Sequence, residues 1–223
     1  MMKNLTLAAV LLLSALPLAA QQWSFGAAAG PFAFGDFVSR RLRPTTGGDS
    51  SGSTTLILTA STRPGVALDL ERKLTHRFAV RFEGTFTRTS LATEVSGGSE
   101  PTEIEGGDLD VSTFMVPLVF RINRAGAIRF HLLAGPALAV YRAQVPSNVE
   151  GASPAFEGTQ AEWGAAFGGG VGWWLSDRFA IEANITDTVT SSPFDREQFP
   201  DVPGIDIPRP QNVHSTLGVR WTF

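Results

Sequence analysis

One stretch of the sequence, residues 112–141, constrains the fold more than any other. It reads STFMVPLVFRINRAGAIRFHLLAGPALAVY, and apolar residues alternate with other residues on both sides of a Gly-containing turn at residues 123–126. A period of two over roughly 10 residues on each side of a turn is typical of paired strands and not of a helix. Each half also has the roughly 9–11 residues that a tilted strand needs to cross a bilayer. The stretch therefore predicts a transmembrane β-hairpin.

The same alternation recurs along the chain and predicts about eight strands in all. They are expected at residues 23–34, 54–70, 78–87, 112–122, 128–141, 162–175, 179–186 and 214–223. The connections alternate between long polar segments, at 36–53, 90–110, 143–161 and 187–211, and short turns. Long loops at one rim and short turns at the other are the pattern of outer-membrane barrels. The expected fold is all-β, an eight-stranded antiparallel up-and-down transmembrane β-barrel with long extracellular loops and short periplasmic turns.

The first 20 residues have the pattern of a secretory signal peptide. Lys3 supplies a positive charge, residues 5–18 form an apolar run, and Ala19 and Ala20 are small residues at the cleavage point. The alternative is a membrane anchor, but the run is short for a spanning helix, and no later run is long and apolar enough to be one. We expect residues 1–20 to be a signal peptide and residues 21–223 to form one barrel domain.

The composition argues against several kinds of site and partner. The sequence contains no cysteine, which excludes disulfides, thiolate metal sites and a lipid-modified N-terminal cysteine. A net charge of −3 gives no basic footprint for nucleic acid. Acidic residues are frequent between Glu94 and Asp110 but lack the ordered spacing of a calcium-binding loop. We therefore predict no metal site, no cofactor and no nucleic-acid partner.

Alternation alone does not reveal which face of a barrel meets lipid, because a soluble lipocalin-like barrel has the same period with its apolar residues inside. The volume of the aromatic side chains decides between the two. An eight-stranded interior is only just wide enough to be filled by side chains. We therefore expect the large aromatic residues on the outside, with the terminal ones at the membrane interfaces. They are Phe78, Phe82, Phe86, Phe114, Phe120, Phe130, Trp163, Phe167, Trp173, Phe179, Trp221 and Phe223.

The opposite face of the strands carries charges of both signs. Opposite charges inside a narrow barrel can pair, as buried ions require. The Gly- and Ala-rich face of residues 164–172 leaves room for long arginine side chains. The alternative is that these charges cover the solvated outer face of a soluble barrel. We predict a structural network that plugs the lumen, formed by Asp69, Arg81, Glu83, Arg121, Arg129, Glu182 and Arg220.

Two prolines, Pro117 and Pro136, fall in the middle of expected strands. Proline cannot donate a ladder hydrogen bond, and inside a sheet it is found mainly at edges and bulges. We therefore predict β-bulges at both positions.

The sequence resembles the small eight-stranded outer-membrane β-barrel proteins of Gram-negative bacteria, which include the transmembrane domain of the OmpA type and the OmpX/Ail type. The resemblance covers residues 21–223 and is carried by VPL at 116–118 with LAGP at 133–136, by LSDRF at 175–179, and by the ending LGVRWTF. The chain departs from full-length OmpA in lacking a peptidoglycan-binding domain, so the resemblance implies no anchoring to the cell wall.

The ending of the chain looks like the signal that the outer-membrane assembly machinery reads in this group. The resemblance therefore implies that this machinery is a partner of the chain. The implied assembly signal consists of Leu217, Val219, Trp221 and Phe223.

Some small barrels that resemble this one act on lipid A, so an enzyme has to be considered. A deacylase needs a serine with a histidine and an acid. His76 is expected in a periplasmic turn and His131 in the interior polar network. His214 is next to Ser215, but adjacent strand residues point to opposite faces and do not pair easily. We predict no catalytic residue and no enzyme.

The sequence thus predicts a monomeric barrel integral to the bacterial outer membrane, in contact with outer-membrane lipid and lipopolysaccharide. Its long loops are expected to serve a structural or surface-interaction role, with no loop partner indicated. A narrow porin-like channel for small solutes or ions is an alternative, which the small face of residues 162–175 favours. A lipid A-modifying enzyme and a soluble periplasmic lipocalin-like carrier are further alternatives.

Overall fold

The computed structural model describes residues 22–42, 54–96, 102–123, 125–144, 158–193 and 205–223 of the chain. Within these ranges no residue is helical. Accordingly, no helix in this part of the chain is long and apolar enough to cross a membrane. The expected signal peptide, residues 1–20, lies outside the described residues.

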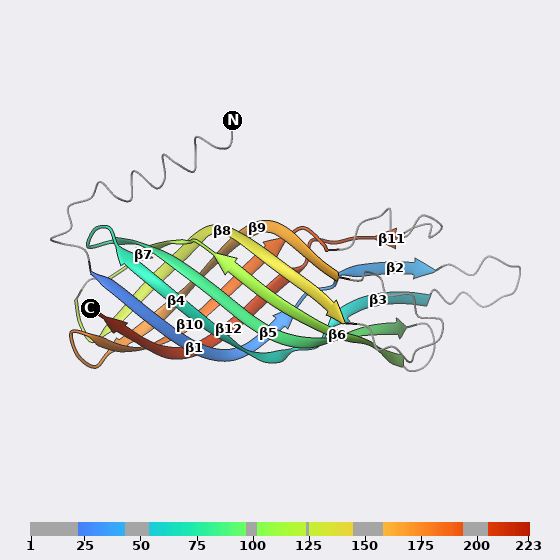
Figure 1. Cartoon of the computed structure of the whole chain (residues 1–223), viewed down its shortest axis with the longest axis horizontal. Helices are drawn as coiled ribbons and strands as arrows, with labels where there is room; N and C mark the ends of the chain where they lie inside the picture. Colours follow the sequence, from blue (N-terminus) through green and yellow to red (C-terminus); the bar gives the residue numbers. More distant parts are fainter. Residues whose placement is uncertain (1–21, 43–53, 97–101, 124, 145–157, 194–204) are drawn as a thin grey trace, which may run out of the picture.

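The strands close into a barrel because the first strand pairs with the last. β1 (Trp23–Phe34) pairs antiparallel with β12 (Gln211–Thr222) on one side and with β4 (Arg63–Lys73) on the other. The ring continues through β5 (Phe78–Ser96), β6 (Thr102–Met115) with β7 (Leu118–Arg121), β8 (Ile128–Gln144), β9 (Gly158–Trp174) and β10 (Phe179–Thr190). β6 and β7 share one place in the wall, so eight strand positions surround the lumen. Figure 1 shows these strands wrapped around the barrel axis. The predicted eight-stranded antiparallel up-and-down barrel is confirmed.

Three short turns join strands at one rim, and polar side chains close them. Thr75 Oγ1 accepts hydrogen bonds from the backbone N–H groups of Arg77 and Phe78, at 3.2 and 3.0 Å. Ser176 Oγ does the same for Arg178 and Phe179, at 3.3 and 3.1 Å. Hydroxyl side chains of this kind favour turns because they replace backbone partners locally. The third turn, between β7 and β8, contains Gly126 with φ of 99°.

At the opposite rim the strands extend farther than the sequence predicted. β5 and β6 remain paired up to Val95 and Thr102, with a register shift between Leu91 and Ala92. β2 (Val38–Leu42), β3 (Thr54–Ala60) and β11 (Ile205–Asp206) continue this wall, and Figure 1 shows them projecting beyond the barrel. The prediction of loops over 36–53, 90–110, 143–161 and 187–211 was therefore wrong for the residues of these segments that form strands, which are 38–42, 90–96, 102–110, 143–144, 158–161, 187–190, 205–206 and 211. Residues 54–70, expected as one strand, belong to two strands, β3 and β4. The backbone hydrogen bonds continue through these strands although apolar and polar residues do not alternate regularly along their sequences.

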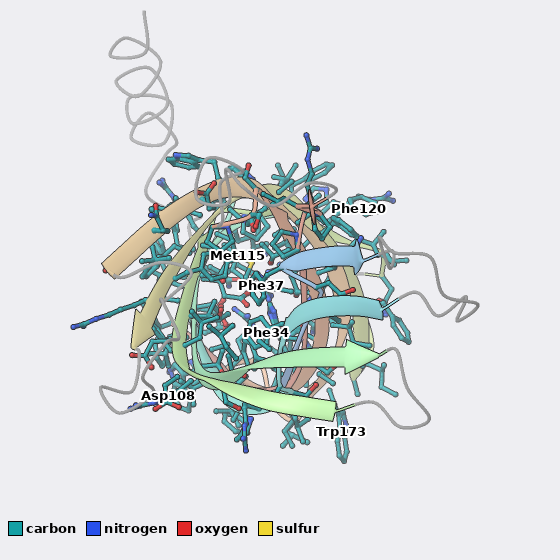
Figure 2. The ribbon with its side chains drawn as sticks, turned by 90° about the vertical axis from the view of Figure 1, so that its right-hand side faces the viewer. Phe34, Phe37, Asp108, Met115, Phe120 and Trp173 are labelled. Atoms are coloured by element: carbon teal, nitrogen blue, oxygen red, sulfur yellow. The ribbon has the colours of Figure 1, made fainter. Side chains whose placement is uncertain are left out.

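The outer face of the barrel is apolar and aromatic, as predicted. Trp163 is 70% exposed and Trp173 is 55% exposed, and Figure 2 shows Trp173 pointing away from the lumen while Phe37 and Met115 point into it. Along β8 the outward-facing apolar positions run from Ile128 to Val140. On a tilted strand this corresponds to a height of about 30 Å, the thickness of the hydrocarbon core of a bilayer.

The predicted bulges at Pro117 and Pro136 are not present. The register of β6 and β7 against β8 is the same on both sides of Pro117, from Met115↔Ala137 to Leu118↔Ala134. The hydrogen bonds also continue there, because Val116 N donates to Pro136 O at 3.1 Å and Arg81 N donates to Pro117 O at 3.0 Å. Each proline thus serves as an acceptor in the ladder, a role that does not require a backbone N–H.

Candidate functional site

Two arginine side chains are buried in the lumen of the barrel. Arg81 of β5 is 1% exposed and Arg220 of β12 is 2% exposed. A buried guanidinium requires ion pairs and hydrogen bonds to offset its desolvation, and carboxylates from three strands supply them. We call the whole group the charge cluster. It consists of Asp69, Glu71, Arg81, Glu83, Arg121, Glu182 and Arg220.

Glu71 is the main partner of Arg81. Its Oε2 atom accepts hydrogen bonds from Nε of Arg81 at 3.0 Å and from Nη2 at 2.8 Å. Nη2 of Arg81 also lies 3.6 Å from Oε2 of Glu182, and Nη1 lies 3.8 Å from Oε2 of Glu83. One guanidinium therefore links carboxylates from β4, β5 and β10 across the lumen.

Arg220 forms the second centre of the charge cluster. Its Nη2 lies 2.8 Å from Oδ1 of Asp69, its Nε lies 2.8 Å from Oε1 of Glu182, and Nη1 donates a hydrogen bond to Ser24 Oγ at 3.3 Å. Gly26 stands between Asp69 and Arg220 in the register of β4, β1 and β12. A Cβ atom at Gly26 would lie 2.0 Å from Oδ2 of Asp69. The missing side chain at Gly26 is what lets Arg220 and Asp69 meet across β1.

Glu83 has a partner that sequence reasoning did not assign. Nε2 of His214 lies 3.5 Å from Oε1 of Glu83, and the imidazole stacks on Phe32 with ring centroids 4.9 Å apart. Glu83 also stands directly opposite Asp69 in the β4–β5 register. Like charges placed opposite each other on paired strands are destabilising, so the neighbouring arginines and His214 are needed to hold these two carboxylates.

The structure places six of the seven predicted network residues in the charge cluster and Arg129 outside it. Arg129 lies at the short-turn mouth of the lumen, with its guanidinium 4.4 Å from the ring centroid of Trp174. Among the described residues it makes no ion pair with the carboxylates of the cluster. Its Nε atom instead donates a hydrogen bond to the backbone oxygen of Gly126, in the turn between β7 and β8, at 3.3 Å.

Glu71 belongs to the charge cluster but was missing from the predicted network. The strand alternation puts it on the same face as Asp69, and the short β4–β5 turn puts it opposite Arg81. Both signals were available in the sequence. Arg121 also reaches Glu71, at the edge of the cluster, where the arginine side chain is 23% exposed.

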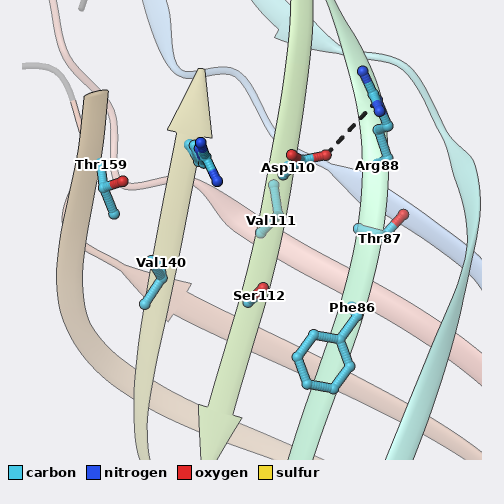
Figure 3. Close-up of a pocket in the computed structure, with 9 residues that line it drawn as sticks. Phe86, Thr87, Arg88, Asp110, Val111, Ser112, Val140 and Thr159 are labelled. Carbon is cyan, nitrogen blue, oxygen red and sulfur yellow. Dashed lines mark ion pairs between the residues drawn. The ribbon is translucent and has the colours of Figure 1, made fainter. Parts of the chain in front are cut away.

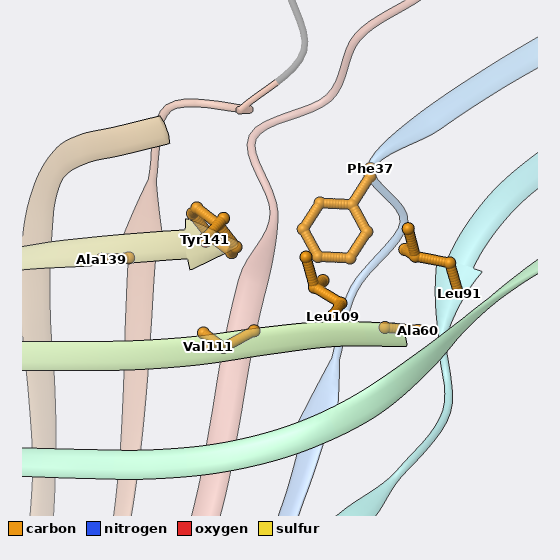
Figure 4. Close-up of a cluster of buried hydrophobic side chains, with 7 residues drawn as sticks. All are labelled: Phe37, Ala60, Leu91, Leu109, Val111, Ala139 and Tyr141. Atoms are coloured by element: carbon orange, nitrogen blue, oxygen red, sulfur yellow. The ribbon is translucent and has the colours of Figure 1, made fainter. Parts of the chain in front are cut away.

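A second layer of side chains closes the lumen nearer the other rim. We call it the apolar cap, and Figure 4 shows its members converging from different strands: Phe37, Ala60, Leu91, Leu109, Val111, Ala139 and Tyr141. Phe37 and Tyr141 are both fully buried and meet edge to face, with centroids 5.8 Å apart. The hydroxyl of Tyr141 accepts a hydrogen bond from Asn212 Nδ2 at 2.9 Å and lies 3.0 Å from Thr190 Oγ1. The lumen is therefore filled by a charged layer and an apolar layer.

The sequence as a whole matches a family model described as "Outer membrane protein beta-barrel domain" over residues 5–223. The chain belongs to this outer-membrane β-barrel family. Membership places the protein in the bacterial outer membrane, and it confirms the predicted resemblance to small outer-membrane barrels. A search of curated proteins finds no match.

Several solved structures are similar to this chain. The outer membrane protein OprG from Pseudomonas aeruginosa superposes with a TM-score of 0.60 at 13% identity, covering 92% of this chain and 96% of OprG. Neisserial surface protein A has a TM-score of 0.47 at 12% identity, covering 91% and 97% of the two chains. Ail of Yersinia pestis has a TM-score of 0.41 at 17% identity, with 91% and 97% coverage. The superposition on OprG indicates a shared fold, and an identity of 13% carries no information about activity.

The family assigns the two rims of the barrel. In outer-membrane barrels the short turns face the periplasm and the long connections face the outside, so the apolar cap is extracellular and Arg129 lies at the periplasmic mouth.

The three histidines occupy different environments. His131 faces the lumen, with Nε2 2.9 Å from Oδ1 of Asn184, and His76 is exposed in a periplasmic turn. His214 is 3% exposed within the lumen, whereas its neighbour Ser215 lines a groove on the outer wall. Within the described residues, no group of three or more potential ligands could hold a metal ion.

The residues of the expected assembly signal lie on the outer face of β12 and at its end. Leu217 and Phe223 are 63% and 64% exposed, and Trp221 is 51% exposed. The backbone of Phe223 is nevertheless fixed, since its N–H donates to Trp23 O at 2.9 Å. The side chains therefore contribute lipid contact and no interior packing.

Proposed function

We propose that this protein is a plugged, non-conducting barrel that acts structurally and through its extracellular face, without enzymatic activity. The observation that carries the proposal is the burial of Arg81 and Arg220 among four carboxylates in the lumen. Their long side chains occupy the cross-section that a solute would need. A cavity at the periplasmic mouth, next to Arg81 and Arg129, has a volume of only about 20 Å³, close to the space that one water molecule needs.

The extracellular face supports the second half of the proposal. β2, β3 and β11 extend the wall beyond the apolar belt, so paired backbone carries this face away from the membrane. Extended walls and connections at the outer rim are the part of a barrel that other molecules can reach. A surface-interaction role fits this arrangement better than a role confined to the lumen.

A narrow channel is the second candidate, because the inner face of β9 is small. Gly168, Gly170 and Gly172 contribute no side chains to the lumen. However, Glu182 and Trp174 lie near Gly172, and Asn184 and His131 lie near Gly170. These side chains take up the space that the glycines leave, which favours the plugged barrel.

Single-channel recording in planar bilayers tests the proposal. We expect the unmodified protein to give no openings. An Arg81→Ala, Glu71→Ala, Phe37→Ala variant, which opens both layers of the lumen, is expected to conduct. Variants that open one layer alone, Arg81→Ala with Glu71→Ala, or Phe37→Ala, are expected to remain silent. Steady openings of the unmodified protein would contradict the plugged barrel and support the channel.

The non-enzymatic part of the proposal is tested separately. Expression of the chain in a Gram-negative host is expected to leave the mass spectrum of lipid A unchanged. A new lipid A species would contradict it, provided that a His214→Ala, His131→Ala variant of the barrel no longer produces that species.

A further inference from the structure

Positive charge is concentrated at the periplasmic rim of the barrel. In the described residues of the three short turns and the strand ends that flank them, arginine and lysine side chains clearly outnumber carboxylates. The basic residues are Arg72, Lys73, Arg77, Arg121, Arg129 and Arg178, and the carboxylates are Glu71 and Asp177. Glu71 is buried and already shared by Arg81 and Arg121. The rim therefore carries an excess of positive charge.

Three of these arginines come from neighbouring positions in the wall. The backbone N–H of Arg121 on β7 donates to the backbone oxygen of Arg77, just before β5, at 2.8 Å. On its other side Arg121 stands opposite His131 of β8, two residues from Arg129. Residues offset by two positions across paired strands are within reach of each other when their side chains are long. Arg121 and Arg129 both line the small cavity at the mouth of the lumen, so two guanidinium groups of like charge converge there.

Uncharged groups hold Arg129 in this position. Its Nε donates to the backbone oxygen of Gly126 at 3.3 Å, and its guanidinium lies 4.4 Å from the ring centroid of Trp174. Asp177 attracts Arg129, but less strongly than Arg121 repels it. Within the described part of the chain, the two Nη atoms of Arg129 make no hydrogen bond or ion pair. The side chain is therefore fixed with donors that remain available at the mouth.

An arginine near the opposite rim has the counter-charge that Arg129 lacks. Arg88 donates a hydrogen bond to Oδ2 of Asp108 at 2.6 Å, and its Nε lies 3.8 Å from Oδ1 of Asp110. Figure 3 shows Arg88 and Asp110 side by side on neighbouring strands, joined as an ion pair. Two carboxylates thus balance an arginine on the outer wall, whereas the mouth of the lumen has two arginines around one shared carboxylate.

We propose that the periplasmic mouth binds a phosphate group, held between Arg121 and Arg129. A guanidinium has five N–H donors in a fixed fork that matches phosphate oxygens. Arg121 uses Nη2 for Glu71 and Arg129 uses Nε for Gly126, so both keep donors for the anion. The phosphate replaces the repulsion between the two arginines by attraction to both. The cavity has a volume of only about 20 Å³, so the phosphate sits at its entrance and does not pass into the lumen.

Two sources can supply this chemistry. A soluble phosphate ester of the periplasm approaches along the barrel axis, and the head group of an anionic phospholipid approaches from the inner leaflet. Both present phosphate oxygens to the same two arginines, and the experiment separates them. Arg129 is the residue to replace, because it lies outside the charge cluster that stabilises the lumen. The proposal does not depend on whether the lumen conducts.

Calorimetric titration of the detergent-folded chain with inorganic phosphate and with glycerol 3-phosphate, in a buffer without other multivalent anions, tests the soluble source. We expect Arg129→Gln to weaken binding by about tenfold or more, the effect of losing a charge-assisted hydrogen-bonding group. The matched control is Arg178→Gln, which removes the same charge from an exposed turn of the same rim and is expected to leave the affinity within about twofold.

Trp174→Leu distinguishes a fixed site from diffuse attraction by the rim. This variant keeps every charge but removes the ring that orients Arg129. We expect it to weaken phosphate binding by about threefold, the effect of losing one cation–π contact. Diffuse attraction predicts no change. Heat-dependent gel mobility of every variant verifies that the barrel is folded.

Nanodiscs that contain phosphatidylglycerol in neutral lipid test the phospholipid source. Native mass spectrometry of the released barrel measures the retained phosphatidylglycerol. If the ligand is a head group, the unmodified chain retains this lipid, Arg129→Gln loses it, and free phosphate does not bind. If the ligand is soluble, calorimetry detects it and lipid retention is equal in both chains. Absence of binding in both arms, or equal weakening by Arg129→Gln and Arg178→Gln, would overturn the proposal.

Discussion

Glu71 and Arg81 stand directly opposite each other on β4 and β5, and both side chains are 2% exposed. Two hydrogen bonds to a single carboxylate oxygen, at 3.0 and 2.8 Å, join them inside the barrel. Carboxylates outnumber arginines in the charge cluster, so each arginine is shared by several partners. Removing an arginine from the cluster is therefore expected to lower the stability of the barrel more than removing a carboxylate.

Replacing Arg81 by methionine should strongly destabilise the barrel. The change removes the two hydrogen bonds that Arg81 donates to Glu71 and leaves Arg121 and Arg220 as the partners of that buried carboxylate. Breaking a buried ion pair from one side costs about 3–5 kcal/mol of unfolding free energy. Urea denaturation in lipid vesicles measures the effect. Arg178→Met, at an exposed position, is the control and is expected to change stability by about 0.5 kcal/mol or less. An unchanged urea midpoint for Arg81→Met would show that the charge cluster does not stabilise the fold.

Replacing Glu83 by glutamine should cost much less than Arg81→Met. Glu83 stands opposite Asp69, and its nearest contact in Arg81 is 3.8 Å away. The substitution removes one member of a like-charge pair and keeps the shape of the side chain. We expect a loss of less than about 1 kcal/mol, because the relief of repulsion offsets the lost contacts. The same denaturation measurement checks this, and a loss as large as that of Arg81→Met would refute the argument from charge balance.

A methyl group at Gly26 should break the contact between Asp69 and Arg220. The Cβ atom of Gly26→Ala would lie 2.0 Å from the carboxylate of Asp69, so the carboxylate has to move away from Arg220. We expect a loss of about 1–3 kcal/mol, typical of an overpacked site. Gly84→Ala is the control, since its Cβ would meet Phe86 at an ordinary 3.4 Å. In an Asp69→Asn background the Gly26→Ala effect should shrink, and full additivity would contradict a shared mechanism.

Replacing Phe223 by alanine should impair assembly of the barrel in cells without lowering the stability of the folded barrel. The side chain is 64% exposed, and the backbone hydrogen bonds to Trp23 do not depend on it. We therefore expect the purified variant to refold in detergent like the unmodified chain but to accumulate poorly in the outer membrane of a Gram-negative host. Phe25→Ala on the neighbouring strand, at 47% exposure, is the control and should assemble normally. Equal accumulation of the two variants in the outer membrane would contradict an assembly role for the C-terminal residue Phe223.

The wall of the barrel was predictable from the sequence because the two faces of a membrane-spanning strand have different surroundings. One face contacts lipid and the other faces the lumen. Phe82 and Arg81 are adjacent, and their opposite locations follow from the period of the pleat together with the volume argument. Outside the membrane this contrast disappears. The polar alternation near Thr87, Thr89 and Glu94 does not distinguish strand from loop, which is why the extensions of β5 and β6 were missed.

The sequence predicted which charged residues lie on the lumen face of the strands, but it did not predict which of them pair with each other. Glu71 was overlooked although the register of a short turn places it opposite Arg81, which is a local inference. The pairing of Arg220 with Asp69 could not be derived in this way. It depends on the closure of the ring across β1 and on the empty position at Gly26, and no short-range sequence pattern reports either feature.

The location of Arg220 has a consequence for how the barrel forms. The β4–β5 hairpin contributes three carboxylates to the charge cluster, Asp69, Glu71 and Glu83, but only one of the cluster's arginines, Arg81. Arg220 arrives with β12, the last strand of the chain, when that strand docks against β1. An open sheet therefore carries uncompensated negative charge on the surface that becomes the lumen. We expect charge neutralisation and ring closure to occur as a single cooperative step, so that a half-assembled sheet does not accumulate within the bilayer.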